Sequence, residues 1–244
     1  MRHKFGKIIV IGLGGSIVFP GQIDWRFLQR FRSFIRSRIS KKRFILVVGG
    51  GRLARVYQEA AGKVVSVTDE DRDWLGIHAT RSNAHLLRTV FRDLADPIVI
   101  DSRNRIKKLR RPITVASGWF PGWSTDYIAI RLAADFGASE VIIAGKPAFV
   151  YPIRSGGTLR ALASSNGAGD KELNKKHPFS KLTWNEYLKL IPKKWKPGLH
   201  SPVDPVAAHL AEKEKIKAII VNGKNLKNFG ILLRGKNFKG TIIG

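Results

Sequence analysis

The 244-residue chain contains no cysteine and few acidic residues, with 18 Asp and Glu against 44 Lys and Arg. Without cysteine there is no disulfide, no thiolate metal ligand and no cysteine nucleophile. No apolar run is long enough to cross a bilayer, and Met1-Arg2-His3-Lys4 leads into an apolar strand rather than a signal-peptide core. These absences predict a cytoplasmic protein that has no membrane partner.

The formal net charge of +26 attracts polyanions, which include nucleic acids, anionic membranes and phosphorylated metabolites. The basic residues are spread along the whole chain instead of forming one tail. That dispersal favours a basic proteome, a salty cytoplasm or a hot habitat as the origin of the charge. A nucleic-acid partner is compatible with the composition but is not favoured by it.

Short apolar runs alternate with helical patterns along the chain, in an order typical of an α/β protein. Strands are expected over residues 7–11, 43–48, 97–100, 113–116, 140–144 and 218–221. Helices are expected after Asp24 and over residues 53–61, 74–94, 124–136, 184–190 and 206–213. This alternation predicts a three-layer α/β/α sandwich with a largely parallel sheet, in a single domain over residues 1–244.

Two segments near the carboxyl end interrupt this alternation. Residues 230–233 and 241–243 are expected to pair as a terminal hairpin. Residues 155–169 are rich in Gly and Ser, which predicts a mobile loop. An unstructured surface insertion is favoured there over a substrate lid.

The most informative motif is a triple glycine, Gly49-Gly50-Gly51, between an apolar strand and a basic helix. Residues without Cβ let backbone N–H groups close on an anion at a helix N-terminus. Arg55, one turn into the helix, can direct its guanidinium to the same place. The motif therefore favours a phosphate site over the alternative, which is tight packing of the turn.

A second glycine-rich turn, Gly12–Ser16, follows the first expected strand. It lacks the third glycine of a dinucleotide-binding turn because Ile17 stands there, and no acidic residue ends the second strand. Dinucleotide binding is therefore rejected. In a parallel sheet both glycine turns open on the carboxyl edge, where they fit a chain of phosphates or two phosphates that exchange a phosphoryl group.

Asp73 lies where the sequence pattern starts a long helix. A carboxylate is favoured at that position by the helix dipole, so Asp73 can be an N-cap. It can equally accept hydrogen bonds from ribose hydroxyls. The spacing alone favours the cap.

The turn over residues 118–126 combines aromatic residues with Gly and Pro. Trp119, Phe120 and Trp123 can stack on a base while Ser124 and Thr125 read its edge. The same residues can instead form a hydrophobic plug over the sheet end, with Ser124 or Thr125 capping the next helix. The sequence leaves these two alternatives equal.

Together these motifs resemble the amino acid kinase superfamily, and most closely its archaeal-type uridylate (UMP) kinase branch. The similar segments are residues 11–16, 48–55, 73–84, 121–126, 203–208 and 240–243, in the order of the family. The resemblance covers nearly the whole chain. It implies an ATP- and Mg²⁺-dependent kinase that phosphorylates UMP to UDP in pyrimidine nucleotide biosynthesis.

The resemblance also implies the site residues and an assembly. The ATP-binding residues would be Gly15, Ser16, Gly51, Arg55, Gly145, Lys146 and Tyr151. The UMP-binding residues would be Gly50, Asp73, Trp119, Phe120, Pro121, Gly122, Trp123, Ser124 and Thr125. Catalysis would depend on Arg55, Gly15 and Ser16, with Mg²⁺ on the donor phosphates. UMP would occupy a lobe of about residues 1–137 and ATP a lobe of about 138–244, and the chain would form a homo-oligomer, a hexamer in relatives.

Three departures from the family pattern leave alternatives open. Gly12 stands where many members carry a lysine, and residues 145–151 keep Val and Tyr but lose Thr, Asn and Asp. An acidic residue expected soon after Tyr151 is not evident. The chain could therefore phosphorylate another small phosphate or carboxylate, or act as a catalytically weak regulator that binds nucleotide or RNA.

Overall fold

The computed structural model describes residues 2–155, 158–162, 177–194 and 201–244. The strands of its large sheet are β1 (Ile8–Leu13), β2 (Arg43–Val48), β3 (Ala95–Ile100), β4 (Ile113–Ala116), β5 (Glu140–Gly145), β8 (Lys181–Leu182), β9 (Lys217–Asn222) and β10 (Thr241–Ile243). Their order is β3-β4-β2-β1-β5-β9-β10-β8. Only the β9–β10 pair is antiparallel, so the expected largely parallel sheet is confirmed.

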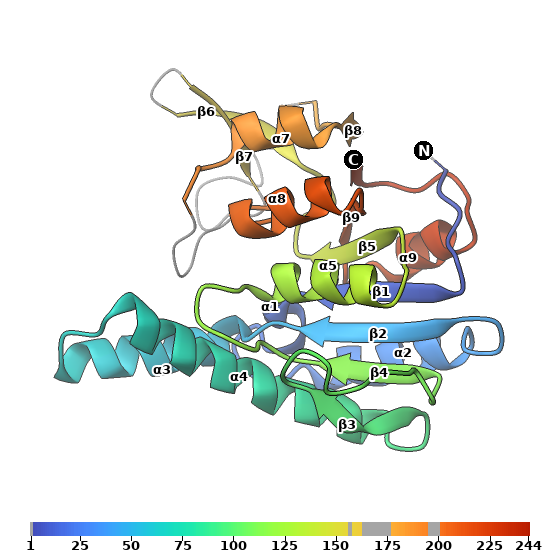
Figure 1. Cartoon of the computed structure of the whole chain (residues 1–244), viewed down its shortest axis with the longest axis horizontal. Helices are drawn as coiled ribbons and strands as arrows, with labels where there is room; N and C mark the ends of the chain where they lie inside the picture. Colours follow the sequence, from blue (N-terminus) through green and yellow to red (C-terminus); the bar gives the residue numbers. More distant parts are fainter. Residues whose placement is uncertain (1, 156–157, 163–176, 195–200) are drawn as a thin grey trace.

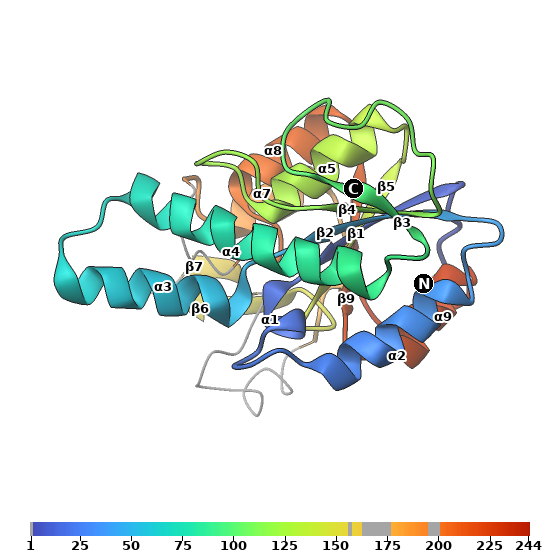
Figure 2. The same cartoon turned by 90° about the horizontal axis from the view of Figure 1, so that it is seen from below.

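Helices cover both faces of this sheet (Figures 1 and 2). Helices α5 (Thr125–Asp135), α7 (Trp184–Leu190) and α8 (Pro205–Lys213) pack on one face. The other face carries α1 (Gly15–Val18), α2 (Trp25–Arg36), α4 (Asp69–Val90) and α9 (Leu226–Leu233). The predicted three-layer sandwich is therefore confirmed.

The strands are apolar because both of their faces are buried. In β1, Val10 packs toward α5, whereas Ile9 and Ile11 pack toward α2 and α9. Such strands have near-continuous apolar runs instead of alternation, which is why they were found from the sequence. None of the helices in the described ranges is long and apolar enough to span a bilayer.

Several helix starts follow the capping chemistry expected from the sequence. Asp24 caps α2, where its carboxylate accepts a hydrogen bond from the Phe27 N–H at 3.0 Å. Thr183 and Glu186 form the expected capping box at α7. Asp204 caps α8, and Pro205 occupies its first turn.

The expected terminal hairpin is wrong. Residues 230–233 belong to α9, which Asn225 caps through the Asn228 N–H at 3.0 Å. Phe229 and Leu232 lie three residues apart on its buried face, a helical spacing. Strand β10 pairs instead with β9, which comes before α9 in the chain.

The predicted loop over residues 155–169 is wrong in part. Strands β6 (Tyr151–Ser155) and β7 (Thr158–Leu162) form a separate antiparallel pair. The remainder of that segment, residues 156–157 and 163–169, lies outside the described residues. The sequence of β7, Thr-Leu-Arg-Ala-Leu, alternates polar and apolar residues over its first four positions, a strand pattern that its Gly and Ser neighbours obscured.

Helices α3 (Gly51–Val64) and α4 extend side by side beyond the edge of the sheet (Figures 1 and 2). Thr68 caps α4 with its side chain and forms a capping box with Asp71. No residue of α3 is buried. The two helices therefore form an arm whose outer surface is open in the single chain.

Candidate functional site

The two glycine turns meet at the carboxyl edge of the sheet. The Gly49 N–H donates to the Leu13 carbonyl at 3.0 Å, and a Cβ on Gly15 would overlap the backbone of Gly49 and Gly51. Gly51 adopts a φ of 64°, a left-handed conformation that favours glycine. The tight-packing alternative therefore accounts for these glycines by itself, and it also brings the two turns together where a phosphate chain was expected.

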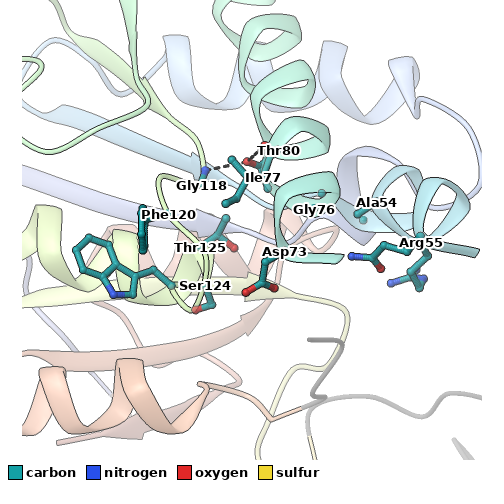
Figure 3. Close-up of a pocket in the computed structure, with 14 residues that line it drawn as sticks. Ala54, Arg55, Asp73, Gly76, Ile77, Thr80, Gly118, Phe120, Ser124 and Thr125 are labelled. Atoms are coloured by element: carbon teal, nitrogen blue, oxygen red, sulfur yellow. Dashed lines mark hydrogen bonds between the residues drawn. The ribbon is translucent and has the colours of Figure 1, made fainter. Parts of the chain in front are cut away.

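A pocket of about 300 Å³ lies beside this contact, between α3, α4 and the turn before α5 (Figure 3). Its volume is at the lower end of the range for small-molecule sites. The pocket is lined by eight of the residues expected from the sequence: Gly50, Gly51, Arg55, Asp73, Phe120, Trp123, Ser124 and Thr125. Residues from three separate segments thus converge on one cavity.

Asp73 is the fifth residue of α4, so it is not the helix cap that its spacing favoured; Thr68 has that role. The Asp73 carboxylate accepts a hydrogen bond from the Gly122 N–H at 2.8 Å and lies in the pocket between Thr125 and Arg55 (Figure 3). Burial raises the pKa of Asp73, and the Gly122 N–H partly offsets this by favouring the charged form. The carboxylate is held in place with hydrogen-bonding capacity left for a ligand.

The aromatic turn is divided between the core and the pocket. Trp119 is buried, and its indole N–H donates to the Ile100 carbonyl at 3.2 Å, so this ring belongs to the core below the turn. Phe120 is 59% exposed and Trp123 is 36% exposed, and both line the pocket. Trp74 lies 6.3 Å from Phe120 between ring centroids, which extends the aromatic surface onto α4. One ring therefore acts as a plug, and the exposed rings form a wall suited to stacking.

Two buried polar residues of α4 connect this helix to the other walls of the pocket by hydrogen bonds. The Asn83 amide donates to the Gly49 carbonyl at 2.8 Å and to the Gly50 carbonyl at 3.2 Å. The Thr80 hydroxyl accepts from the Gly118 N–H at 2.8 Å. Neither residue was assigned a role from the sequence. The available signal was a polar side chain on the inward face of a helix, because buried polar groups need partners.

Six residues that line the pocket were not expected from the sequence: Ala54, Gln58, Gly76, Ile77, Thr80 and Gly118. Most of them are small or apolar and carry no chemical signature of their own. Gln58 and Thr80 are the exceptions, and both are already engaged: the Gln58 amide donates to the Arg72 carbonyl at 2.7 Å, and the Thr80 hydroxyl accepts from the Gly118 N–H at 2.8 Å. These residues define the shape of the cavity, but their residue types do not identify it from the sequence.

Ser124 connects the pocket to two acidic groups. Its hydroxyl caps α5 by accepting from the Asp126 and Tyr127 N–H groups, both at 3.1 Å, and donates to the Asp204 carboxylate. Burial raises the pKa of Asp204. Burial, aided by the negative charge of Asp204, raises the pKa of Asp126 to about 8.

Of the expected ATP residues, Gly51 and Arg55 line the pocket, whereas Gly15, Ser16, Gly145, Lys146 and Tyr151 do not. The turn of Gly15 and Ser16 lies against β5, since the Gly14 N–H donates to the Ala144 carbonyl at 3.0 Å. Lys146 follows β5 and has an exposed side chain. Of the expected UMP residues, Trp119, Pro121 and Gly122 do not line the pocket. No three His, Asp or Glu side chains converge to hold a metal within the part of the chain that the structure describes.

A largely parallel sheet with glycine turns at its carboxyl edge defines a class of α/β proteins that bind ligands at that edge. The sequence model of the Amino acid kinase family matches residues 7–151, and the chain belongs to that family. It is 30% identical to a uridylate kinase of Pyrococcus abyssi, over 96% of this chain and 98% of that protein. A uridylate kinase of Methanosarcina barkeri is 32% identical, with 89% and 88% covered.

Solved structures agree with the fold. The crystal structure of a uridylate kinase from Archaeoglobus fulgidus matches with a TM-score of 0.77 and 27% identity, covering 98% of this chain and all of that one. A UMP kinase from Ureaplasma parvum matches with a TM-score of 0.72 at 20% identity, which supports the fold alone.

Proposed function

We propose that this protein transfers the terminal phosphate of ATP to UMP, giving ADP and UDP. The observation that carries the proposal is the pocket itself, where a glycine turn, Arg55, Asp73 and an aromatic wall converge. These groups match a phosphate, a ribose and a base in turn. Near-full-length similarity to proteins named uridylate kinases supports the same acceptor.

In this proposal, UMP occupies the pocket with its ribose on Asp73 and its base beside Phe120 and Trp123. Thr125 reads the base edge. The ATP phosphates meet the glycine turns at Gly15, Ser16 and Gly51, and Arg55 screens the phosphoryl group in transfer. The acceptor phosphate oxygen attacks the γ-phosphorus in line as the bond to the ADP oxygen breaks. Positioning and charge screening do this work without a protein nucleophile.

Mg²⁺ is part of this proposal as an ion that arrives with ATP. The described residues offer glycine backbone and a guanidinium at the phosphate positions, and no three-ligand cage. This fits an ion held mainly by phosphates and water, which is the usual arrangement for magnesium. When bound, it neutralises charge on the donor phosphates. The glycine turns and Arg55 remain the protein's own contribution to holding those phosphates.

The exposed aromatic wall supports a second candidate, an acceptor other than UMP. The Trp123 ring lies 6.2 Å from the Phe120 ring between centroids. A wider apolar surface could accept a different base or another small phosphate. Comparison of acceptors under identical conditions separates the two candidates.

The first test is formation of ADP and UDP from Mg-ATP and UMP, followed in wild type and in Asp73→Ala. We expect the KM for UMP to rise about tenfold or more, because a hydrogen bond to a charged group contributes about 1.5–3 kcal/mol. The KM for ATP should change far less. Asp69→Asn, an exposed acid one turn earlier on α4, is the matched control. Equal effects on both KM values would refute the ribose assignment.

We further propose that the chain acts as a homo-oligomer in the cytoplasm, with α3 in the contact. Helix α3 buries none of its residues within the chain, yet Val56, Tyr57 and Val64 are large, apolar and exposed. A second copy of the chain would cover them. The division into acceptor and ATP lobes near residue 137 stays a prediction.

A further inference from the structure

Positive charge is concentrated at the amino ends of the strands, on the side of the sheet opposite the pocket. Two adjoining hollows, of about 340 and 190 Å³, lie at the amino ends of β1, β2 and β4 and share Ser40, Lys41 and Lys42. The cations that line them, which we call the amino-edge strip, are Lys7, Arg38, Lys41, Lys42, Arg43, Arg110 and Arg234. No acidic residue lines either hollow.

Seven Lys and Arg side chains in the described ranges have a carboxylate partner, and none of the seven belongs to the amino-edge strip. Elsewhere, Arg32 pairs with Asp93 at 2.9 Å, and Arg131 pairs with Glu214 at 3.2 Å. Across the described ranges, no member of the amino-edge strip lies within 4.0 Å of a carboxylate oxygen. The strip is therefore a local excess of charge that the fold does not neutralise.

Like charges are also brought together within the strip. A Cβ on Gly230 would lie 3.2 Å from one guanidinium nitrogen of Arg38 and 3.4 Å from one of Arg234. Burial, reinforced by the neighbouring charge of Arg234, lowers the pKa of Arg38. The two guanidinium groups repel each other above Gly230. An anion bound between them would offset this repulsion and accept hydrogen bonds from both.

Hydrogen bonds to backbone carbonyls explain three members of the strip, Arg38, Lys42 and Arg43, the last of which donates to the Arg111 carbonyl at 3.0 Å. Arg38 donates to the Phe34 carbonyl at 2.5 Å, which satisfies the carboxyl end of α2 and its dipole. Lys42 donates to the carbonyls of Phe5 and Gly6 and is likewise structural. Three exposed members, Lys7, Lys41 and Arg110, have no such role, so their charge is available to a ligand.

We propose that the amino-edge strip binds the phosphate backbone of a nucleic-acid strand. Lys7 immediately precedes β1, Arg43 begins β2 and Arg110 lies three residues before β4, and these three strands are neighbours in the sheet, about 4.8 Å apart. The strip also includes Arg38, just after α2, and Arg234, just after α9, so its cations come from five elements and are available to more than one phosphate. No exposed aromatic ring lines it. The contacts are therefore with phosphates and are independent of base sequence.

The fold produces this site from residues that are far apart in the chain. Because basic residues are dispersed along the sequence, the charge of +26 was attributed to a basic proteome, a salty cytoplasm or a hot habitat. Residues near positions 7, 40, 110 and 234 meet only because parallel strands start at one edge and two helices end there. The strip lies at the opposite edge from the pocket, so a strand bound there leaves the UMP site open.

The test is fluorescence anisotropy with a labelled oligoadenylate RNA of about 16 nucleotides, near the upper site size of a small single-strand binder. Adenylate avoids a base that resembles UMP. Wild type is compared with Lys7→Gln/Lys41→Gln/Arg110→Gln. We expect the slope of log K against log salt to fall in magnitude by about 2, since each lost phosphate contact contributes about 0.7 on a single strand.

The control is Lys63→Gln/Lys181→Gln/Lys189→Gln, which removes the same net charge from exposed residues of α3, β8 and α7. It should keep the wild-type slope, and saturating UMP should leave RNA affinity unchanged. The proposal is overturned if the control loses as much affinity, if UMP displaces the RNA, or if wild type binds no RNA at low salt. Displacement by inorganic polyphosphate at a lower phosphate concentration than unlabelled RNA would assign the strip to polyphosphate instead.

Discussion

Individual glycines of the site are constrained by backbone contact as well as by any ligand. Gly51 has a φ of 64°, and a Cβ there would overlap the carbonyl of Gly15. We expect Gly51→Ala to lower the free energy of unfolding by at least about 1–2 kcal/mol, from the left-handed conformation alone. Urea denaturation without nucleotide measures this.

The control for that variant is Gly62→Ala. Gly62 lies in α3 with open space around its Cα, so alanine should stabilise the protein by about 0.5–1 kcal/mol through helix propensity. If Gly51→Ala were as stable as Gly62→Ala, the contact between the two glycine turns would not exist in solution.

Asp126 should make stability depend on pH. Its pKa is raised to about 8 in the folded protein, so the folded state holds a proton that the unfolded chain releases near pH 4. The free energy of unfolding should therefore fall as pH rises from about 4 to about 8, by up to about 1.4 kcal/mol per pH unit. In Asp126→Asn that fall should be reduced. Parallel stability curves for the two proteins between pH 5 and 8 would contradict the assignment.

Asp73 shows the limit of sequence reasoning about a single residue. The sequence identified the residue and its two alternatives, but the spacing favoured the N-cap. The helix begins at Asp69, five residues before the predicted start at residue 74, because Thr68 and Asp71 form a reciprocal pair of hydrogen bonds that caps it. Only the fold shows that the carboxylate then faces Gly122, which is 49 residues away in sequence.

At the scale of elements, the starts of α5 and α8 are connected through one hydroxyl. Ser124 caps α5 and donates to Asp204, which itself caps α8. We expect Ser124→Ala to lower the free energy of unfolding by about 1–2 kcal/mol, because it removes a cap and leaves the buried carboxylate without its donor. Thermal unfolding of the ligand-free protein measures the loss.

Thr68→Ala is the matched comparison, since Thr68 caps α4 on the exposed arm without a buried partner. Its loss should be smaller, about 0.5–1 kcal/mol. A larger loss from Thr68→Ala than from Ser124→Ala would show that the connection to Asp204 adds nothing.

The exposed surface of α3 should determine the association state. Tyr57→Lys/Val64→Lys places two charges on apolar positions that make no buried contact in the chain. We expect light scattering to show a smaller assembly than wild type, with circular dichroism unchanged. A wild-type protein that is monomeric at assay concentrations would contradict the proposed contact.

Most elements could be predicted because buried strands and capped helices carry local signals. The strand over residues 113–116 and the caps Asp24, Thr183 and Asp204 agree with the structure. The terminal hairpin failed because a short apolar run fits a buried helix face as well as a strand. The cap Asn225 was the local signal that separates the two.

At the scale of the whole molecule, the sequence predicted the layers but not which distant segments would meet. The pocket joins residues near positions 50, 75 and 120 because α3 and the turn before α5 follow the neighbouring strands β2 and β4, and α4 packs against α3. The amino-edge strip forms in the same way at the other edge. Such contacts depend on strand order, which alternation along the chain does not determine.

The choice of acceptor is the central claim, and one measurement tests it most directly. Purified protein is incubated with Mg-ATP and with UMP, CMP, AMP, GMP or dUMP in turn, and ADP formation gives kcat/KM for each acceptor. We predict the highest value for UMP, with UDP formed in equal amount to ADP. No turnover with any acceptor, from folded protein that still binds UMP, would contradict the account and favour a regulatory nucleotide-binding role.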